Sequence, residues 1–320
     1  LITKAQSRFF DIELQLVTFK KGLIAMETIS AKNERSIILP SLLAALILLI
    51  VGTIGYFGIR YTASDLTFQK SLVAAAQNNG SLTYQEQARA ISIFPYRDGF
   101  YRVFSQTNLA LANTLASQTP QGASPSAQVQ QNITTLIQQS INSGRQATAI
   151  APQSYVNWQN LSSIYRGLIG FGQNAESFSI ATAQQSINLD PNNPQQYISL
   201  GGIYYQLGQW DQAQNQFQIA VALKPDYANS HYNLGHALEQ KGDLENALVQ
   251  YKIVRSLVVQ DKASLEQIDK EIAALQGKVQ KGGALDKTGA LNIDTPETQL
   301  PPQNPPVKIP APQVATQSSK

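Results

Sequence analysis

Cysteine is absent from this chain, which excludes disulfides, thiolate metal sites and cysteine nucleophiles. Histidine is scarce as well. The two histidines, His231 and His236, are five residues apart and would point to different faces of a helix. No acidic residue has metal-ligand spacing to either of them, so we predict no metal site.

An excess of charge of one sign is also lacking. The chain has 24 Lys and Arg against 21 Asp and Glu, a net charge of +3. Residues 152–281 contain nine basic and eleven acidic side chains, so their net charge is 9 − 11 = −2. A nucleic-acid surface requires a basic stripe. We therefore predict no nucleic-acid partner.

A catalytic constellation is missing too, since no nucleophile is paired with a base. The letters GFGQNA at Gly170–Ala175 match a dinucleotide fingerprint, but that motif needs a preceding strand and a following helix. Here it falls in the turn of an expected helical hairpin. We predict that this segment is not an enzyme, that it has no catalytic residues and that it needs no cofactor.

One long apolar run is present, IILPSLLAALILLIVGTIGYFGI at Ile37–Ile59. Its 23 residues carry no charge, and at about 1.5 Å per residue they can span a bilayer core of about 30 Å. A buried core helix is normally shorter, and a cleaved signal peptide has a shorter apolar region. We predict a transmembrane helix over 37–59.

Basic residues flank this run unequally. Six precede it (Lys4, Arg8, Lys20, Lys21, Lys32 and Arg35), and Arg60 and Lys70 follow it. Because Lys and Arg favour the cytoplasmic side, we predict a cell-membrane protein with a cytoplasmic juxtamembrane segment at 1–36 and an extracytoplasmic remainder. Residues 9–26 are expected to be either an interfacial amphipathic stretch or the end of an earlier membrane helix.

Prolines recur with fixed neighbours along the rest of the chain. They are Pro95, Pro152, Pro191 and Pro225. Five residues before them stand Ala90, Ala147, Ser186 and Ala220; six residues after them stand Tyr101, Trp158, Tyr197 and His231. Nine residues after them stand Phe104, Leu161, Leu200 and Leu234. These offsets indicate an internal repeat.

The most regular copy has Tyr197, Leu200, Gly201, Tyr204, Ala213, Phe217 and Pro225. With 34 residues between Pro191 and Pro225, it resembles the tetratricopeptide repeat, a pair of antiparallel helices. A second copy has His231, Leu234, Gly235, Ala247 and Tyr251, and a looser one has Trp158, Leu161, Tyr165 and Pro191. The resemblance implies an all-α fold, with an α-solenoid of helical hairpins following one transmembrane helix. Gly201 and Gly235 are expected where paired helices press together.

The predicted layout after the membrane helix has four parts. Degenerate helical repeats occupy 66–152, and tetratricopeptide repeats occupy 153–260. An amphipathic helix at 261–281 caps the array, because terminal repeats need a polar outer face. Residues 282–320, rich in Pro and Gln, are predicted to be a disordered tail.

The resemblance also implies a binding surface, since such repeats bind partners on a concave face formed by the first helix of each pair. Carried over by position, its residues are Asn160, Ile198, Gly202, Tyr205, Tyr232, Asn233, His236 and Glu239. Gly202 is expected to leave room there for a ligand. The two asparagines could pair with an extended peptide backbone or simply tolerate an exposed helix surface.

Two functions follow from these features. The first is a bacterial membrane-anchored scaffold whose extracytoplasmic repeats bind a protein or peptide in the cell envelope. The alternative rests on architecture alone. The chain resembles the C-terminal part of O-antigen ligase or polymerase-like proteins, whose active site would lie upstream and whose repeats would engage glycan-assembly proteins.

Overall fold

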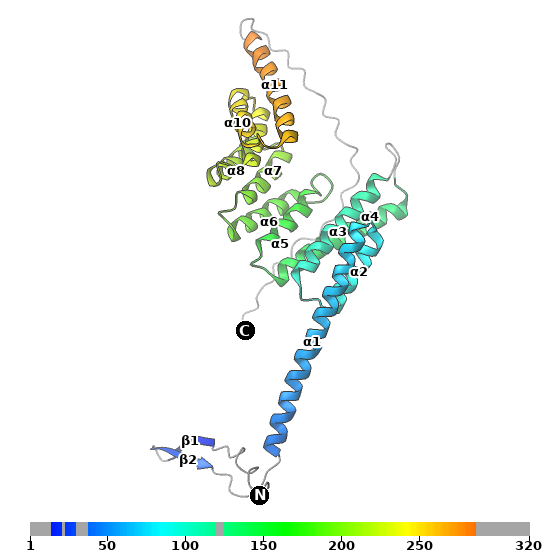
Figure 1. Cartoon of the computed structure of the whole chain (residues 1–320), viewed down its shortest axis with the longest axis vertical. Helices are drawn as coiled ribbons and strands as arrows, with labels where there is room; N and C mark the ends of the chain where they lie inside the picture. The colour runs from blue at the N-terminus through cyan, green and yellow to red at the C-terminus, as the bar shows by residue number, and fades with distance from the viewer. Residues whose placement is uncertain (1–13, 21–22, 30–37, 119–124, 286–320) are drawn as a thin grey trace. The chain divides into compact units, whose positions relative to one another are not determined.

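The computed structural model describes residues 14–20, 23–29, 38–118 and 125–285. The chain divides into two compact units, Leu1–Arg60 and Tyr61–Lys320. Helix α1 (Ile38–Ala76) begins in the first unit and ends in the second (Figure 1). The predicted tail at 282–320 lies outside the described residues from position 286 onwards.

The first unit contains an antiparallel hairpin that the sequence analysis did not predict. Strand β1 (Leu14–Lys20) pairs with β2 (Leu23–Ile29), with Leu14 opposite Ile29 and Lys20 opposite Leu23. The alternative of an earlier membrane helix over 9–26 is therefore wrong for the described part, and the interfacial alternative stays a prediction. Both strands contain β-branched residues, and only two residues separate them, which suits a tight hairpin.

Helix α1 has the length and composition of a membrane span. Its stretch Ser41–Ala76 is long and apolar enough to cross a bilayer, and no residue of its most apolar window is buried inside the protein. This includes most of the predicted span. A helix that exposes leucine and isoleucine in this way is not the core helix of the unit.

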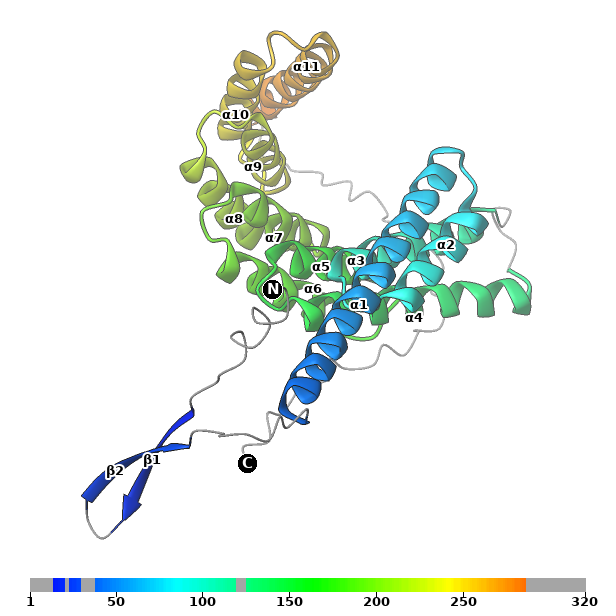
Figure 2. The ribbon, with the colours of Figure 1, turned by 60° about the horizontal axis from the view of Figure 1, so that its bottom comes forward.

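The second unit is a stack of helical pairs. Its helices after α1 are α2 (Gly80–Ile93), α3 (Asp98–Ser117), α4 (Ala127–Ile150), α5 (Tyr155–Arg166), α6 (Ala175–Leu189), α7 (Pro194–Gln206), α8 (Trp210–Leu223), α9 (Ala228–Gln240), α10 (Leu244–Leu257) and α11 (Lys262–Leu285). Each helix packs on the next from α2 to α11, and α3, α5, α7 and α9 also pack on one another in that order. Figure 2 shows α7 to α11 continuing the stack. The all-α solenoid is confirmed.

The repeated prolines separate the pairs at a constant offset. Pro95, Pro152, Pro191 and Pro225 each stand three residues before a helix, and these helices begin at Asp98, Tyr155, Pro194 and Ala228. The residue before each proline lies outside the α conformation, as at Phe94 (φ −142°, ψ 92°) and Asp190 (φ −142°, ψ 70°), because a following proline disfavours that conformation. Proline therefore ends the second helix of one pair and starts the next.

After Pro152, Pro191 and Pro225, the aromatic residue six positions later closes the same turn. Trp158 Nε1 donates to the Pro152 carbonyl at 2.8 Å, and the Tyr197 hydroxyl donates to the Pro191 carbonyl at 3.0 Å. His231 Nε2 lies 2.8 Å from the Pro225 carbonyl. A ring that can donate a hydrogen bond thus ties the first helix to the turn before it.

The packing glycines lie where the sequence analysis expected them. A Cβ added at Gly201 would stand 2.5 Å from a ring carbon of Phe217, and one at Gly235 would meet the ring of Tyr251. Both rings are buried. The aromatic side chain of the second helix therefore fills the space that glycine leaves on the first.

The degenerate pairs solve the same problem with small side chains on both helices. Serine replaces glycine at Ser105 and Ser162, and the ring position holds Gly144 and Ala183. Hydroxyls then join the helices: Ser140 Oγ donates to the Ser105 carbonyl at 2.7 Å, and Ser162 Oγ donates to the Ser179 carbonyl at 2.8 Å. Pairs with small side chains on both helices are thus held by hydrogen bonds as well as by contact.

Gly201→Ala should destabilise the fold by about 1–3 kcal/mol, the usual cost of an overpacked core. The matched control is Gly277→Ala on α11, where an added Cβ meets nothing within 4 Å. This control should be neutral or stabilising by up to about 1 kcal/mol. Urea unfolding of the chain in detergent measures both. In a Phe217→Ala background the cost of Gly201→Ala should shrink, and equal costs in the two backgrounds would contradict the packing account.

Candidate partner-binding surface

Two of the predicted concave residues are not available to a partner. Ile198 is 7% exposed and belongs to the core that α7 shares with α8, α9 and α10. Gly202 is buried as well. A Cβ added there would lie 2.9 Å from an Arg166 guanidinium nitrogen, so an arginine from α5 occupies the space expected for a ligand. Both expectations are corrected by contacts from neighbouring helices.

Arg166 is held in place by α7. Its Nε donates to Gln206 Oε1 at 3.0 Å, and Gln206 Nε2 donates back to the Arg166 carbonyl at 3.4 Å. Burial lowers the pKa of Arg166. The guanidinium therefore links α5 to α7 over the backbone of Gly202.

Helix α11 contacts three of the four predicted residues of α9. The Tyr232 hydroxyl donates to Glu271 Oε1 at 2.9 Å, and His236 Nε2 lies 3.6 Å from Glu271 Oε2. Glu239 accepts from Lys278 Nζ at 2.6 Å and from the Tyr251 hydroxyl at 3.0 Å. These side chains join α9 and α10 to the capping helix instead of presenting free groups.

This cluster shifts the ionisation of its members. Burial, then the hydrogen bond to Glu271, raises the pKa of Tyr232 to about 12. Burial and the Glu239 carboxylate raise the pKa of Tyr251. Burial opposes the ionised form of Glu239, but the bonds from Lys278 and Tyr251 outweigh it and leave its pKa lowered.

The remaining predicted residues have mixed positions. Tyr205 packs edge-on against Trp210, with ring centroids 4.9 Å apart. Asn233 donates to the Asn229 carbonyl at 2.7 Å, one turn earlier in its own helix. Asn160 is 7% exposed. It donates to Ser105 Oγ at 2.9 Å and accepts from Gln106 Nε2 at 2.8 Å.

A groove lies between α3 and α5, beside Asn160. It has a volume of about 460 Å³ and is lined by Arg102, Gln106, Leu109, Ala110, Asn113, Val156, Gln159, Asn160, Ser163 and Ile164. Most of its polar side chains are amides, together with one guanidinium. Sequence reasoning found Asn160 but missed the others. The proline offsets could have found them: Arg102 follows Pro95 by seven residues, as Tyr232 follows Pro225, and Gln106 and His236 follow the same prolines by eleven.

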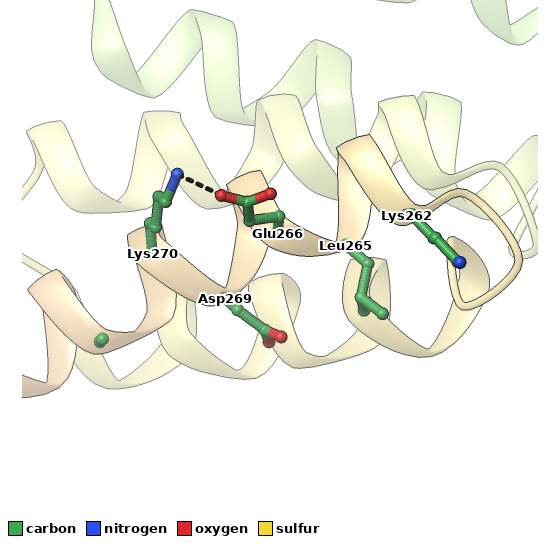
Figure 3. Close-up of a pocket in the computed structure, with 6 residues that line it drawn as sticks. Lys262, Leu265, Glu266, Asp269 and Lys270 are labelled. Atoms are coloured by element: carbon green, nitrogen blue, oxygen red, sulfur yellow. Dashed lines mark hydrogen bonds and ion pairs between the residues drawn. The ribbon is translucent and has the colours of Figure 1, made fainter.

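A second depression lies on the outer face of α11 (Figure 3). Lys270 pairs with Glu266 at 2.7 Å, and Arg255 pairs with Asp269 at 2.6 Å. These exposed charges neutralise each other, within α11 and between α10 and α11, so we give this depression no binding role. Among the described residues, no group of three or more His, Asp and Glu side chains could hold a metal ion.

The raised pKa of Tyr232 predicts a stability loss at high pH. The folded form keeps its proton up to about pH 12, whereas an unfolded tyrosine loses it near pH 10. The unfolded state thus binds fewer protons between these values, so stability should fall as pH rises through this range. Tyr232→Phe should make that fall shallower in denaturant unfolding between pH 9 and 12. An unchanged slope for Tyr232→Phe would contradict the assignment.

Comparisons with known proteins place part of this chain in a repeat family. Residues 201–242 match the family described as TPR repeat. A solved structure of PilW, described as a widely conserved type IV pilus biogenesis factor, is 18% identical with a TM-score of 0.49, covering 71% of this chain and 93% of that one.

A thermophilic TPR protein of Thermus thermophilus is 16% identical with a TM-score of 0.47, covering 67% of this chain and 98% of that one. A solved structure of the MamA protein is 16% identical with a TM-score of 0.46, and the match covers 63% of this chain and 95% of that one. No curated protein sequence matches the chain. The segment that matches the TPR repeat family runs from within α7, through α8, to just past the end of α9.

Proposed function

We propose that this chain is a membrane-anchored interaction module whose groove between α3 and α5 binds an extended segment of a protein partner. The observation that carries the proposal is the groove itself, which lies on the first helices of two successive pairs and is lined by amides and one guanidinium. Tetratricopeptide proteins bind peptides and proteins, and this is a part of the concave surface that neighbouring helices leave open.

The lining chemistry suits an extended backbone. Gln106, Asn113 and Ser163 are exposed, and Gln159 is half-buried, so each can offer donors and acceptors to peptide groups. Val156 and Leu109 supply apolar area between them. Arg102 lies 3.4 Å from the Asn157 amide oxygen, and it adds a positive charge that favours a segment with acidic side chains.

The groove replaces the site that position alone predicted on α7 and α9. Arg166 fills the space over Gly202, and α11 pairs with Tyr232, His236 and Glu239. A partner would have to break these bonds to reach the later repeats. In the groove between α3 and α5, by contrast, the side chains of Gln106, Asn113 and Ser163 are exposed.

Anchoring rests on α1 and on the unequal basic flanks. A helix of this length and composition is exposed along its apolar stretch, and a lipid bilayer would remove that apolar surface from water. Lys and Arg on the amino-terminal side favour a cytoplasmic start and an extracytoplasmic solenoid. No described feature favours the glycan-transfer alternative or a glycan-assembly partner, and we do not propose either.

Ser163→Arg should abolish peptide binding by filling the groove with a long charged side chain. The control is Ser177→Arg, a serine on α6 that is also exposed and does not line the groove. The chain in detergent is panned against a random peptide library, and the selected peptides are titrated against both variants. Loss with Ser163→Arg alone supports the groove. Equal binding by both variants would place the site elsewhere.

Anchoring and sidedness are tested together. The intact chain should stay in the membrane fraction after alkaline carbonate washing, and deletion of residues 41–59 should release it. In spheroplasts, added protease should degrade the region after Arg60 while a cytoplasmic control protein survives. Release of the intact chain by carbonate would refute the anchor, and protection of the solenoid would refute the orientation.

A further inference from the structure

The turn between α2 and α3 carries a cluster of aromatic rings around one arginine. Tyr61 of α1 meets Phe94 edge-to-face, with ring centroids 5.6 Å apart, and Phe94 meets Tyr96 in the same way at 5.4 Å. The Arg97 guanidinium lies 4.8 Å from the Tyr61 ring centroid and 4.3 Å from that of Phe100. The cluster therefore joins the turn to α1.

The cluster lies at the level of α1 where the apolar run stops. Ile59 ends that run, and Arg60 and Tyr61 follow it in the same helix. Helix α2 runs back towards this level, and Arg97 NH1 bonds to Asp65 Oδ1 at 2.7 Å. Rings and ion pair thus fix the α2–α3 turn beside the first helical turn that follows the run.

Two members of the cluster are not used by the core. Tyr96 is 65% exposed and Tyr61 is 46% exposed, whereas Phe100 is 3% exposed and stacks on Phe68. A half-exposed tyrosine has an apolar ring and a polar tip, and this is the side chain enriched where membranes meet water. Both exposed rings lie at the position along α1 where an interface is expected.

We propose that the α2–α3 turn rests on the lipid surface, with Tyr61 and Tyr96 among the headgroups. This inference depends on the membrane span proposed above. Arg97 is paired with Asp65, so the contact is aromatic and does not need anionic lipid. It gives the solenoid a second attachment beside α1 and limits how the first helical pair can tilt on the membrane.

The test places a tryptophan in the turn and asks whether lipid reaches it. The native Trp158 and Trp210 are first replaced by Tyr and Phe; tyrosine already serves at the Trp158 position in the next repeat, as Tyr197. Tyr96→Trp is then added as the only tryptophan. The full chain is reconstituted in phosphatidylcholine vesicles brominated on acyl carbons close to the headgroup.

The matched control is Phe171→Trp in the same background. Phe171 is 48% exposed and follows α5, the first helix of its pair. Tyr96 instead precedes α3, the first helix of its own pair, so the two probes lie at opposite ends of first helices. Emission from Tyr96→Trp should shift to the blue and be quenched by the brominated lipid, and emission from Phe171→Trp should not. Equal, unquenched emission from both would overturn the proposal.

A third variant separates this inference from the span itself. Phe57→Trp places the probe within the apolar run of α1. If Phe57→Trp is quenched and Tyr96→Trp is not, the span stands and the contact of the turn is wrong. If neither is quenched, the span has failed and the inference with it. Quenching of Tyr96→Trp that appears only when phosphatidylglycerol is added would overturn the aromatic account of the contact.

Discussion

The close approach of paired helices is the constraint on which the rest of this solenoid depends. Every pair must bring two backbones together, and the side chains at the crossing have room for one large group at most. Gly201 with Phe217 and Gly235 with Tyr251 assign that group to the second helix. The early pairs have no large side chain at the corresponding positions, which are Ser105 and Gly144 in one pair and Ser162 and Ala183 in the next. Serine hydroxyls join the two helices there instead.

This exchange explains why the early repeats look degenerate while their helices pair in the same way. A pattern defined by glycine and phenylalanine misses pairs in which both positions are small. The requirement that is kept is steric. Ala90, Ala147, Ser186 and Ala220, five residues before each proline, are all buried, because no larger side chain fits where the second helix meets its neighbours.

Stacking also decides which part of the concave surface is covered by neighbouring helices. A helix that follows in the stack contacts the first helix of the preceding pair, so the last concave face is used by the cap. Glu271 and Lys278 thus form hydrogen bonds with Tyr232 and Glu239 of α9. Arg166 fills the space over Gly202. Between α3 and α5, by contrast, the amides line an open groove.

The sequence by itself determined the local features of this protein. Pro95, Pro152, Pro191 and Pro225 predict the turns because proline restricts the residue before it, and Gly201 and Gly235 predict the helix crossings because nothing larger fits. The charge-free run Ile37–Ile59 predicts the exposed apolar helix from length and composition alone. Each of these depends on residues that are near in the chain or on a repeating interval.

Only the tertiary structure decided which predicted surface residues are covered by neighbouring helices, and that the amino-terminal segment forms a hairpin. Arg166 reaches Gln206 across 40 residues, and Tyr232 reaches Glu271 across 39, and neither separation equals the 34-residue interval of the most regular copy. Position in a repeat places a side chain on the concave face but does not say which neighbour covers it. The hairpin at Leu14–Ile29 depends on pairing between two strands, which an apolar pattern of this length does not distinguish from a helix.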